Sequence, residues 1–289
     1  MPQLIRNILW PTDFSKEAQE ALLYAGLFAK KFSARITALH VAPDFVPGLY
    51  ETSHVIQSEI SLRTDALKKQ AQTKIKSAAQ KKGVAIKKVI VTEGSPAKRI
   101  IETAEKERVD LIVMGKIGQS GLKNILVGSV ANQVLRHSPV PILVTKRGKK
   151  KLAVKKILVP TDFAKEEDVE QKFAGRLAEQ FGASLTFIYV LELYGHEFRM
   201  VDHMFQSVFE KFKRREKRIG KRVKVAKVVT RGVNAAIGID TYSRTHRFDL
   251  IVMATCAGGL SRFILGSNTE KVISNTDLPV LALPPKYCA

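Results

Sequence analysis

The chain has 289 residues and a hydrophobic content of 45%, which is long and apolar enough for two globular domains of ordinary size. Its 2 cysteines argue against a disulfide framework, and its net charge of +21 permits anionic partners such as nucleotides, nucleic acid or a membrane surface. No apolar run approaches the roughly 18 residues of a membrane-spanning helix. Arg6 interrupts the first apolar run, so no secretory leader is visible and we expect a cytoplasmic protein without a membrane span.

Strands and helices are predicted to alternate along the first half of the chain. An apolar run from Leu4 to Trp10 ends at Pro11-Thr12-Asp13, and Ser15 to Lys31 follows with apolar residues at helical spacing. Either Asp13 or Ser15 can cap that helix. Further strands are expected at residues 36–41, 84–91, 111–114 and 139–144, with a long polar helix ending near residue 82 and shorter helices opening near residues 95 and 129. This alternation predicts an α/β fold with a parallel sheet.

Two of these elements carry more detailed expectations. The long helix has Leu67, Ala71, Ile75 and Ala78 on one side, which we expect to be buried. The fifth strand begins Pro139-Val140-Pro141, and because proline cannot donate to a ladder, that strand is expected at an edge of the sheet.

The most informative stretch follows the fourth strand. The apolar run ends at Gly115, Gly118 comes three residues later, and Gly128-Ser129 opens the next helix. Glycine lets backbone approach a ligand closely, and free N–H groups at a helix start bind phosphate. A glycine-rich turn with a serine cap and no ligand is the alternative for these residues alone.

A second loop, Pro11-Thr12-Asp13, follows the first strand. In a flavodoxin-like sheet the strand order reverses near the first strand, and ligands bind outside the carboxyl ends of strands at that point. If the first and fourth strands are neighbours, Asp13 faces the glycine loop of residues 115–118.

The second half of the chain repeats the first. Residues 157–163 repeat residues 8–14, residues 249–253 repeat residues 110–114, and residues 278–283 repeat the fifth strand. The protein is therefore predicted to be two copies of one α/β domain. We place the domains at residues 1–146 and 154–289, with a basic linker at residues 147–153.

The copies differ at the glycine loop. Gly115 becomes Ala254, Gly118 becomes Ala257, and the loop leading to Gly266-Ser267 is one residue shorter. An added Cβ at two close-approach positions hinders a ligand or forces a different backbone. We therefore expect one competent nucleotide site, in the first domain, and a degenerate second.

With these motifs the chain resembles the universal stress protein family, as a tandem two-domain member. The family's pattern of Gly, two residues, Gly, nine residues and Gly-Ser is matched by Gly115, Gly118, Gly128 and Ser129. The resemblance implies two flavodoxin-like (Rossmann-like) domains, each a five-stranded parallel sheet with helices on both faces. It also implies bound ATP or another adenine nucleotide, with Mg²⁺ as an option.

The resemblance further implies the residues of the site. Asp13 would lie by the ribose and phosphates, Val41 would offer backbone groups to the adenine, and the glycines would line ribose and phosphates. The implied nucleotide-binding residues are Pro11, Thr12, Asp13, Val41, Met114, Gly115, Gly118, Gly128, Ser129 and Val130. The degenerate second site retains Asp162, Val190, Gly266 and Ser267.

The resemblance implies partners and a role as well. Family members pair through their fifth strands, so the two halves are expected to pair with each other, and a further homodimer stays open. The implied role is a stress-response or signalling module whose nucleotide occupancy alters conformation or partner binding. The lysine motif of phosphate-loop enzymes is missing and no base is placed to activate water, so we expect no dedicated catalysis and at most slow ATP hydrolysis.

Two basic runs give the alternative function, binding of nucleic acid or anionic surfaces. A solvated helix face explains the same lysines. The first run is Lys68, Lys69, Lys74, Lys76, Lys81, Lys82, Lys87 and Lys88, and the second is Lys211, Lys213, Arg214, Arg215, Lys217, Arg218, Lys221, Arg222 and Lys224. Phe209 and Phe212 in the second run are expected to face the core.

No metal site is predicted. The spacing of His196, Glu197, Asp202 and His203 matches no metal motif. Cys256 is interpreted as an inert small residue in the second domain's loop, with redox sensing left open.

Overall fold

A computed structural model describes residues 3–42, 54–118, 127–146, 152–163, 169–192, 201–215, 223–255 and 266–284. At residues 54–64, 169, 201–204 and 213–215 it describes the backbone alone. No helix within these ranges is long and apolar enough to cross a membrane.

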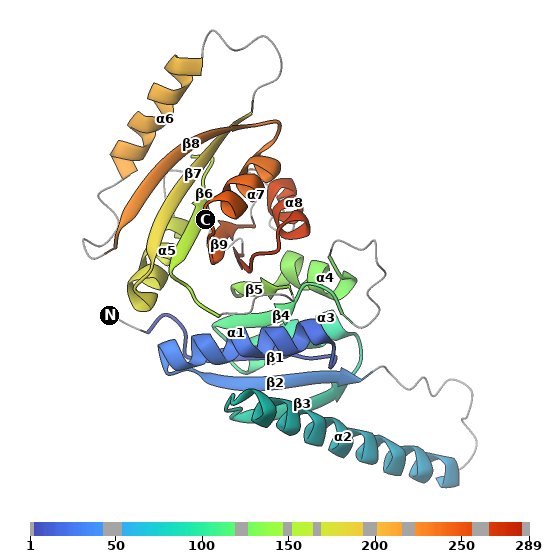
Figure 1. The fold of residues 1–289 in the computed structure, drawn as a ribbon. Coiled ribbons are helices and arrows are strands. Elements are labelled where there is room, and N and C mark those ends of the chain that lie inside the picture. Colours follow the sequence, from blue (N-terminus) through green and yellow to red (C-terminus); the bar gives the residue numbers. More distant parts are fainter. Residues whose placement is uncertain are drawn as a thin grey trace.

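One ten-stranded sheet runs through the molecule, in the order β3-β2-β1-β4-β5-β10-β9-β6-β7-β8 (Figure 1). All strand pairs within each half are parallel, and β5 and β10 are antiparallel. The first half contributes β1 (Asn7–Pro11), β2 (Arg35–Ala42), β3 (Lys88–Glu93), β4 (Leu111–Gly115) and β5 (Ile142–Thr145). The second contributes β6 (Lys156–Pro160), β7 (Ser184–Glu192), β8 (Val225–Gly232), β9 (Leu250–Ala254) and β10 (Val280–Leu283).

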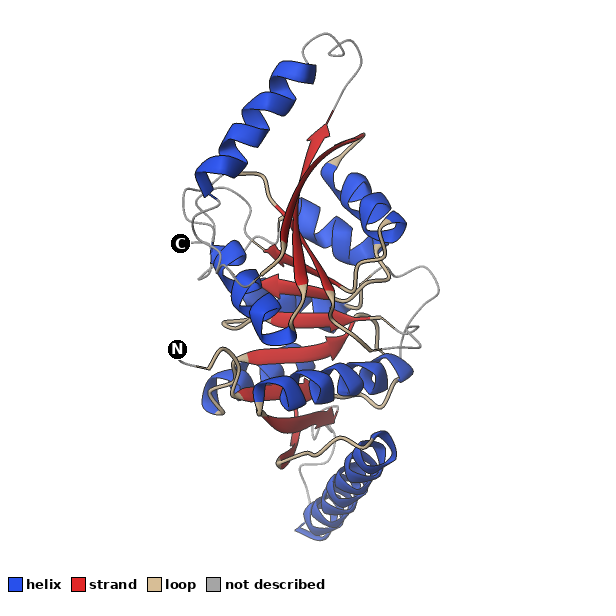
Figure 2. Cartoon of the chain, turned by 60° about the vertical axis from the view of Figure 1, so that its left-hand side comes forward, coloured by secondary structure: helices blue, strands red, loops and turns tan. Residues whose placement is uncertain are grey.

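Helices cover both faces of the sheet (Figure 2). One face carries α1 (Lys16–Phe32), α2 (His54–Lys82), α5 (Val169–Phe181) and α6 (Val201–Arg215), whose apolar residues share one buried cluster. The opposite face carries α3 (Pro96–Lys106), α4 (Ser129–His137), α7 (Ala235–Thr245) and α8 (Ser267–Asn275), which share a second cluster. The predicted α/β fold, repeated in tandem with helices on both faces, is therefore confirmed.

The two halves meet at three places. In the sheet, Leu143 of β5 lies opposite Leu281 of β10, and both are fully buried. On one face the Phe28 ring of α1 lies 5.0 Å from the Phe181 ring of α5. On the other face α4 and α8 are joined by an ion pair between Arg136 and Glu270. The halves thus pair through their fifth strands, as expected, and share one core.

The expected edge position of the fifth strand is wrong for the whole chain. β5 lies between β4 and β10, because the second copy supplies the missing neighbour. The strand also begins at Ile142, after both prolines, so neither ring interrupts the ladder.

Three positions that were expected to be buried are not, namely Leu67, Ala78 and Phe209. Leu67 is 57% exposed, whereas Ala71, Ile75 and Ala79 form the buried stripe of α2. The N-terminal part of α2 extends past the strands (Figure 1). Phe209 is 42% exposed because Phe212 and Val208 take the inward positions of α6.

Gly115 ends β4 directly beneath the first turn of α1. A Cβ built on Gly115 would lie 2.9 Å from Glu17 Cβ and 3.0 Å from the Glu17 carbonyl carbon. Real Cβ atoms essentially never approach that closely, so glycine here is required by helix–strand packing. The structure thus gives this glycine a packing reason, and the close approach of a ligand to its backbone stays a prediction.

Leu281→Ala is expected to lower the free energy of unfolding by about 2–5 kcal/mol, since it opens a cavity in the shared core. Both halves should unfold in one transition at a lower denaturant midpoint, measured by circular dichroism. Leu67→Ala, the same change at an exposed leucine, is the control and should shift the midpoint little. Two separate transitions in the wild-type chain would contradict a shared core.

Gly115→Ala is expected to cost about 1–3 kcal/mol of unfolding free energy, because its Cβ meets α1 backbone that cannot move aside. Gly118→Ala is the matched control, since among the described residues its Cβ would meet the movable Asp13 carboxylate and no backbone. Thermal unfolding of both variants measures the difference. Equal losses would show that packing against α1 does not select Gly115.

Candidate functional site

The strand order reverses between β1 and β4. Ile8 and Leu9 pair with Leu111 and Ile112, so the carboxyl ends of β1 and β4 lie side by side. The loops that follow these strands therefore meet. A Cβ built on Gly118 would lie 2.7 Å from Asp13 Oδ2, which confirms that Asp13 faces the glycine loop.

The turn after β1 is fixed by local hydrogen bonds. The buried Thr12 donates its N–H to Leu39 O at 2.8 Å, and its Oγ1 accepts the Phe14 N–H at 3.1 Å. Asp13 Oδ1 accepts the Ser15 N–H at 3.0 Å, and Ser15 Oγ caps α1 by accepting the Ala18 N–H. Phe14 takes a left-handed φ of 66°, which a non-glycine residue rarely adopts. Such strained backbone concentrates at functional sites.

His40 of β2 packs against this turn. Its Nδ1 lies 2.8 Å from Thr12 O, and its ring centroid is 4.5 Å from that of Phe14. Lys74 Nζ of α2 lies 5.7 Å from the Phe14 ring on the same side. His40 therefore serves the turn, and the half-buried Val41 follows it at the end of β2.

The start of α4 closes the site. Gly128 is the N-cap residue with extended backbone, and its N–H donates to Lys116 O at 2.9 Å. A Cβ on Gly128 would lie 3.4 Å from Lys116 O and 3.5 Å from Gly118 N, so the two glycine segments are in contact. No side chain among the described residues caps this helix start, and Ser129 is exposed there. A helix start without a side-chain cap has N–H groups and a positive dipole end that can attract an anion, and here it lies against Gly118, which in turn faces Asp13.

The predicted residues of the first domain are thus gathered from four elements. Pro11, Thr12 and Asp13 follow or end β1, and Val41 lies near the end of β2. Met114, Gly115 and Gly118 end β4 or follow it, and Gly128, Ser129 and Val130 begin α4. The buried Met114 side chain belongs to the core between β4 and α4, so this residue can offer a ligand only its backbone.

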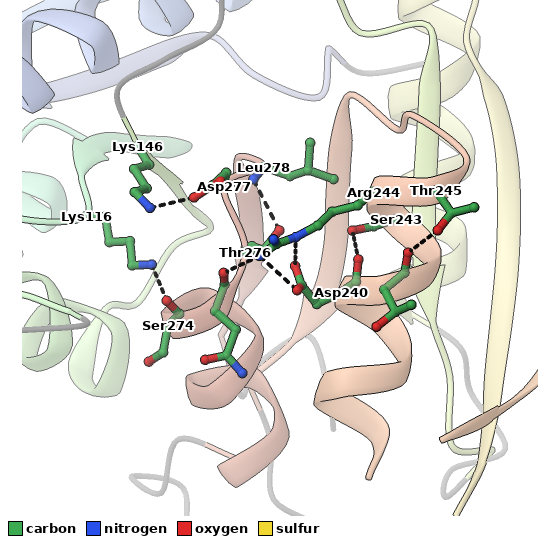
Figure 3. Close-up of polar contacts among 12 residues, drawn as sticks. Lys116, Lys146, Asp240, Ser243, Arg244, Thr245, Ser274, Thr276, Asp277 and Leu278 are labelled. Atoms are coloured by element: carbon green, nitrogen blue, oxygen red, sulfur yellow. Dashed lines mark hydrogen bonds and ion pairs between the residues drawn. The ribbon is translucent and has the colours of Figure 1, made fainter. Parts of the chain in front are cut away.

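Lys116 was not among the residues predicted for the site. It stands between the two glycines of the loop, yet it is only 3% exposed. Its Nζ points away from its own domain and donates to Ser274 O of α8 (Figure 3). Burial, and secondarily the charge of Lys146, lowers the pKa of Lys116 to about 8, while Asp277 and Asp240 oppose that shift. A lysine in an otherwise glycine-rich loop was the available signal.

The second copy repeats the backbone frame. β6 lies beside β9, the Gly266 N–H donates to Thr255 O at 2.7 Å, and Phe163 takes a φ of 57°. Asp162 follows β6 and Ser267 begins α8, in the places of Asp13 and Ser129.

The surroundings of the second site differ from those of the first. Gly266 is buried, and Thr269 Oγ1 in the first turn of α8 donates to Ala254 O at 2.8 Å. Val190 packs against α7, since a Cβ on Gly238 would lie 2.6 Å from Val190 Cγ1. Ala257 lies outside the described residues.

The described residues contain no cluster of three or more His, Cys, Asp or Glu side chains that could hold a metal alone. Asp13 is the carboxylate of the first site that can contact a metal carried by a phosphate ligand. A separate hollow between β3 and α3 is lined by Lys88, Arg99 and Glu107 among others, and holds none of the predicted site residues. His196, Glu197, Cys256 and the side chains of Asp202 and His203 lie outside the described part of the chain.

Comparison with known proteins agrees with this architecture. The model of the universal stress protein family matches residues 4–146 and again residues 153–284. Universal stress protein MJ0531 of Methanocaldococcus jannaschii is 40% identical over 149 residues, covering 51% of this chain and 85% of the relative. Universal stress protein MJ0577 of that organism is 32% identical over 160 residues, covering 51% of this chain and 98% of the relative.

A solved structure covers both halves at once. The crystal structure of a universal stress protein from Archaeoglobus fulgidus superposes with a TM-score of 0.68 at 25% identity, covering 98% of this chain and 99% of that one. With the family matched twice along a chain that folds as two repeats in one sheet, this protein belongs to the universal stress protein family as a tandem two-domain member.

Proposed function

We propose that the first domain binds an adenine nucleotide, ATP by preference, where the carboxyl ends of β1 and β4 meet. The observation that carries this proposal is the start of α4, which has no described side-chain cap and lies against the glycine loop that faces Asp13. A helix start of this kind binds phosphate through N–H groups and the helix dipole. The family membership supports the choice of an adenine nucleotide.

Each part of the nucleotide is assigned to a different group of residues. The N–H groups of Ser129 and Val130 and the Ser129 hydroxyl hold phosphates, with Gly118 and Gly128 giving room for close approach. Asp13 binds the ribose hydroxyls or a Mg²⁺ ion on the phosphates. Thr12 and Pro11 hold Asp13 in place, and the backbone of Val41 takes the adenine edge.

We assign this site to a domain of residues 1–146, followed by a linker at residues 147–153 and a second domain at residues 154–289. The second domain retains Asp162, Val190, Gly266 and Ser267 but is proposed not to bind the nucleotide. Its helix start is more enclosed, because Gly266 is buried and Thr269 bridges the first turn of α8 to the end of β9.

We propose a binding and signalling role in the cytoplasm, in which nucleotide occupancy alters conformation or partner binding. The groups described around the site position phosphates, and none of them is placed as a general base. Slow hydrolysis is the catalytic alternative. It requires phosphate release above a protein-free control that stops in Asp13→Ala.

A second candidate function rests on the exposed lysines of α2 and the turn after it. Lys69, Lys74, Lys76, Lys81, Lys82 and Lys87 are all exposed. Lys68 is half-buried and its Nζ lies 3.2 Å from Glu93 Oε1. These cations favour a polyanionic partner such as nucleic acid, bound through phosphates with an affinity that falls steeply with salt.

The first test is to purify the chain without added nucleotide, denature it and identify released small molecules by mass spectrometry. We expect an adenine nucleotide at about one molecule per chain, because one of the two sites is competent. Two per chain would contradict the demotion of the second domain. An empty chain that also fails to bind added ATP would overturn the nucleotide proposal and leave the basic surface as the leading function.

The two helix starts offer a matched pair of variants. Ser129→Ala is expected to weaken ATP binding roughly threefold to tenfold, the loss of one hydrogen bond to phosphate. Ser267→Ala removes the same hydroxyl from the second domain and should leave the affinity within about twofold of wild type. Isothermal titration calorimetry at fixed salt measures both. The reverse order of effects would place the ligand in the second domain.

A further inference from the structure

Lys116 is a buried cation in a loop where an uncharged residue would fit. Burying an ammonium group is costly unless the structure provides specific partners for it. In the folded chain the cost is visible in the pKa of Lys116, which burial and Lys146 lower from 10.5 to about 8. A buried ammonium group with a strongly shifted pKa is a candidate for a functional role, so its contacts are informative.

Lys116 joins three elements at one point. Its N–H donates to Thr145 O at the end of β5 at 2.7 Å, and its carbonyl accepts the Gly128 N–H at 2.9 Å. Its Nζ donates to Ser274 O near the end of α8. One residue thus ties the start of α4, where phosphate is proposed to bind, to a helix of the other domain.

The last turn of α8 presents backbone carbonyls that attract a cation. Carbonyls in the last turn of a helix lack intrahelical partners and carry the negative end of the helix dipole. Two of them are held by cations in the structure: Ser274 O by Lys116 and Asn275 O by Arg244, at 3.1 Å (Figure 3). Lys116 thereby gains a charge-assisted hydrogen bond across the domain boundary.

Across the described ranges, the bond from Lys116 to the other domain has no counterpart at the equivalent position of the second copy. The position of Lys116 in the second copy is Thr255, which makes the same backbone bonds, to Leu283 O and from the Gly266 N–H. Thr255 is buried, and its hydroxyl has no hydrogen-bond partner among the described residues. The glycine loop of the first domain therefore reaches into the second domain, and within the described part of the chain Thr255 makes no matching contact in return.

A second contact holds the same two helices together. Glu270 in the first turn of α8 accepts hydrogen bonds from Asn132 and Arg136 of α4, both at 3.1 Å. The second domain thus contacts both the loop and the helix of the proposed phosphate position.

We infer that Lys116 is a positioning residue, through which α8 of the second domain holds the glycine loop and the start of α4 in the shape that binds nucleotide. This inference rests on the proposed function. It gives the second domain a role that requires no ligand of its own.

The test is Lys116→Met in the full chain. Methionine has a similar length without the charge, so thermal stability should be kept or raised. ATP affinity at pH 7.5 should fall roughly tenfold, as for the loss of one charge-assisted hydrogen bond. Lys146→Met is the matched control: it removes a neighbouring cation that pairs with Asp277 but leaves Lys116 and its bond to Ser274 O in place, and should leave the affinity at pH 7.5 within about twofold.

A pH series separates positioning from general packing. Lys116 faces Lys146 from the end of β5, Asp277 from the turn after α8 and Asp240 from α7. Its pKa is lowered, so its charge is present below about pH 8 and lost above it. Wild-type affinity should therefore fall as pH rises from 7.5 to 9.5, and the Lys116→Met affinity should stay flat. Lys146→Met should move the fall to higher pH, since Lys146 lowers the Lys116 pKa.

Hydrogen exchange at the Gly128 amide gives a readout without nucleotide, and it should quicken several-fold in Lys116→Met. If the wild-type chain binds ATP and Lys116→Met binds it with the same affinity, the inference about Lys116 is overturned and the proposed function is kept. A wild-type chain that binds no adenine nucleotide would overturn the proposed function. In that case the exchange rate decides whether Lys116 supports the start of α4. An unchanged rate at the Gly128 amide in Lys116→Met would overturn that support, and a faster rate would uphold it.

Discussion

The antiparallel pairing of β5 with β10 is the constraint on which the rest of the structure depends. Each domain alone would end at a short apolar strand with a row of unpaired backbone groups, which invites association. Joining the two edges removes both at once and places Leu143 against Leu281 at the centre of one core. The edge through which single-domain family members are expected to pair is thus occupied within the chain.

That pairing also decides which helices meet. Because β5 and β10 run in opposite directions, the domains are related by an approximate twofold rotation, and equivalent helices face each other across the boundary. α1 meets α5 through phenylalanine rings on one face, and α4 meets α8 through Glu270 on the other. The helices that begin at the two Gly-Ser pairs are therefore in direct contact, although the sites themselves lie at separate strand ends.

Sequence reasoning succeeded where the signal was local or repeated. The period of the apolar residues, the two copies and the facing of Asp13 with Gly118 follow from patterns and one topological rule. It failed where a neighbour distant in sequence decides the environment. Gly115 packs against the first turn of α1, Leu67 is exposed although it lies on the expected apolar side of α2, and Lys116 is buried with its Nζ on Ser274 O of α8. The nearby sequence does not name any of these packing partners, although a lysine in a glycine-rich loop marks position 116 as unusual.

Covalent linkage makes an asymmetric boundary available. In a symmetric dimer of one domain, a lysine at position 116 would occur twice, and each buried ammonium group would carry its own desolvation cost. In the tandem chain the two positions evolve separately, so Lys116 can face the end of α8 while Thr255 takes the equivalent place without charge. One cation then suffices to tie the loop of one half to the helix of the other. Under the proposed function the second domain contributes without a ligand of its own, because its last helical turn supplies the acceptor for Lys116.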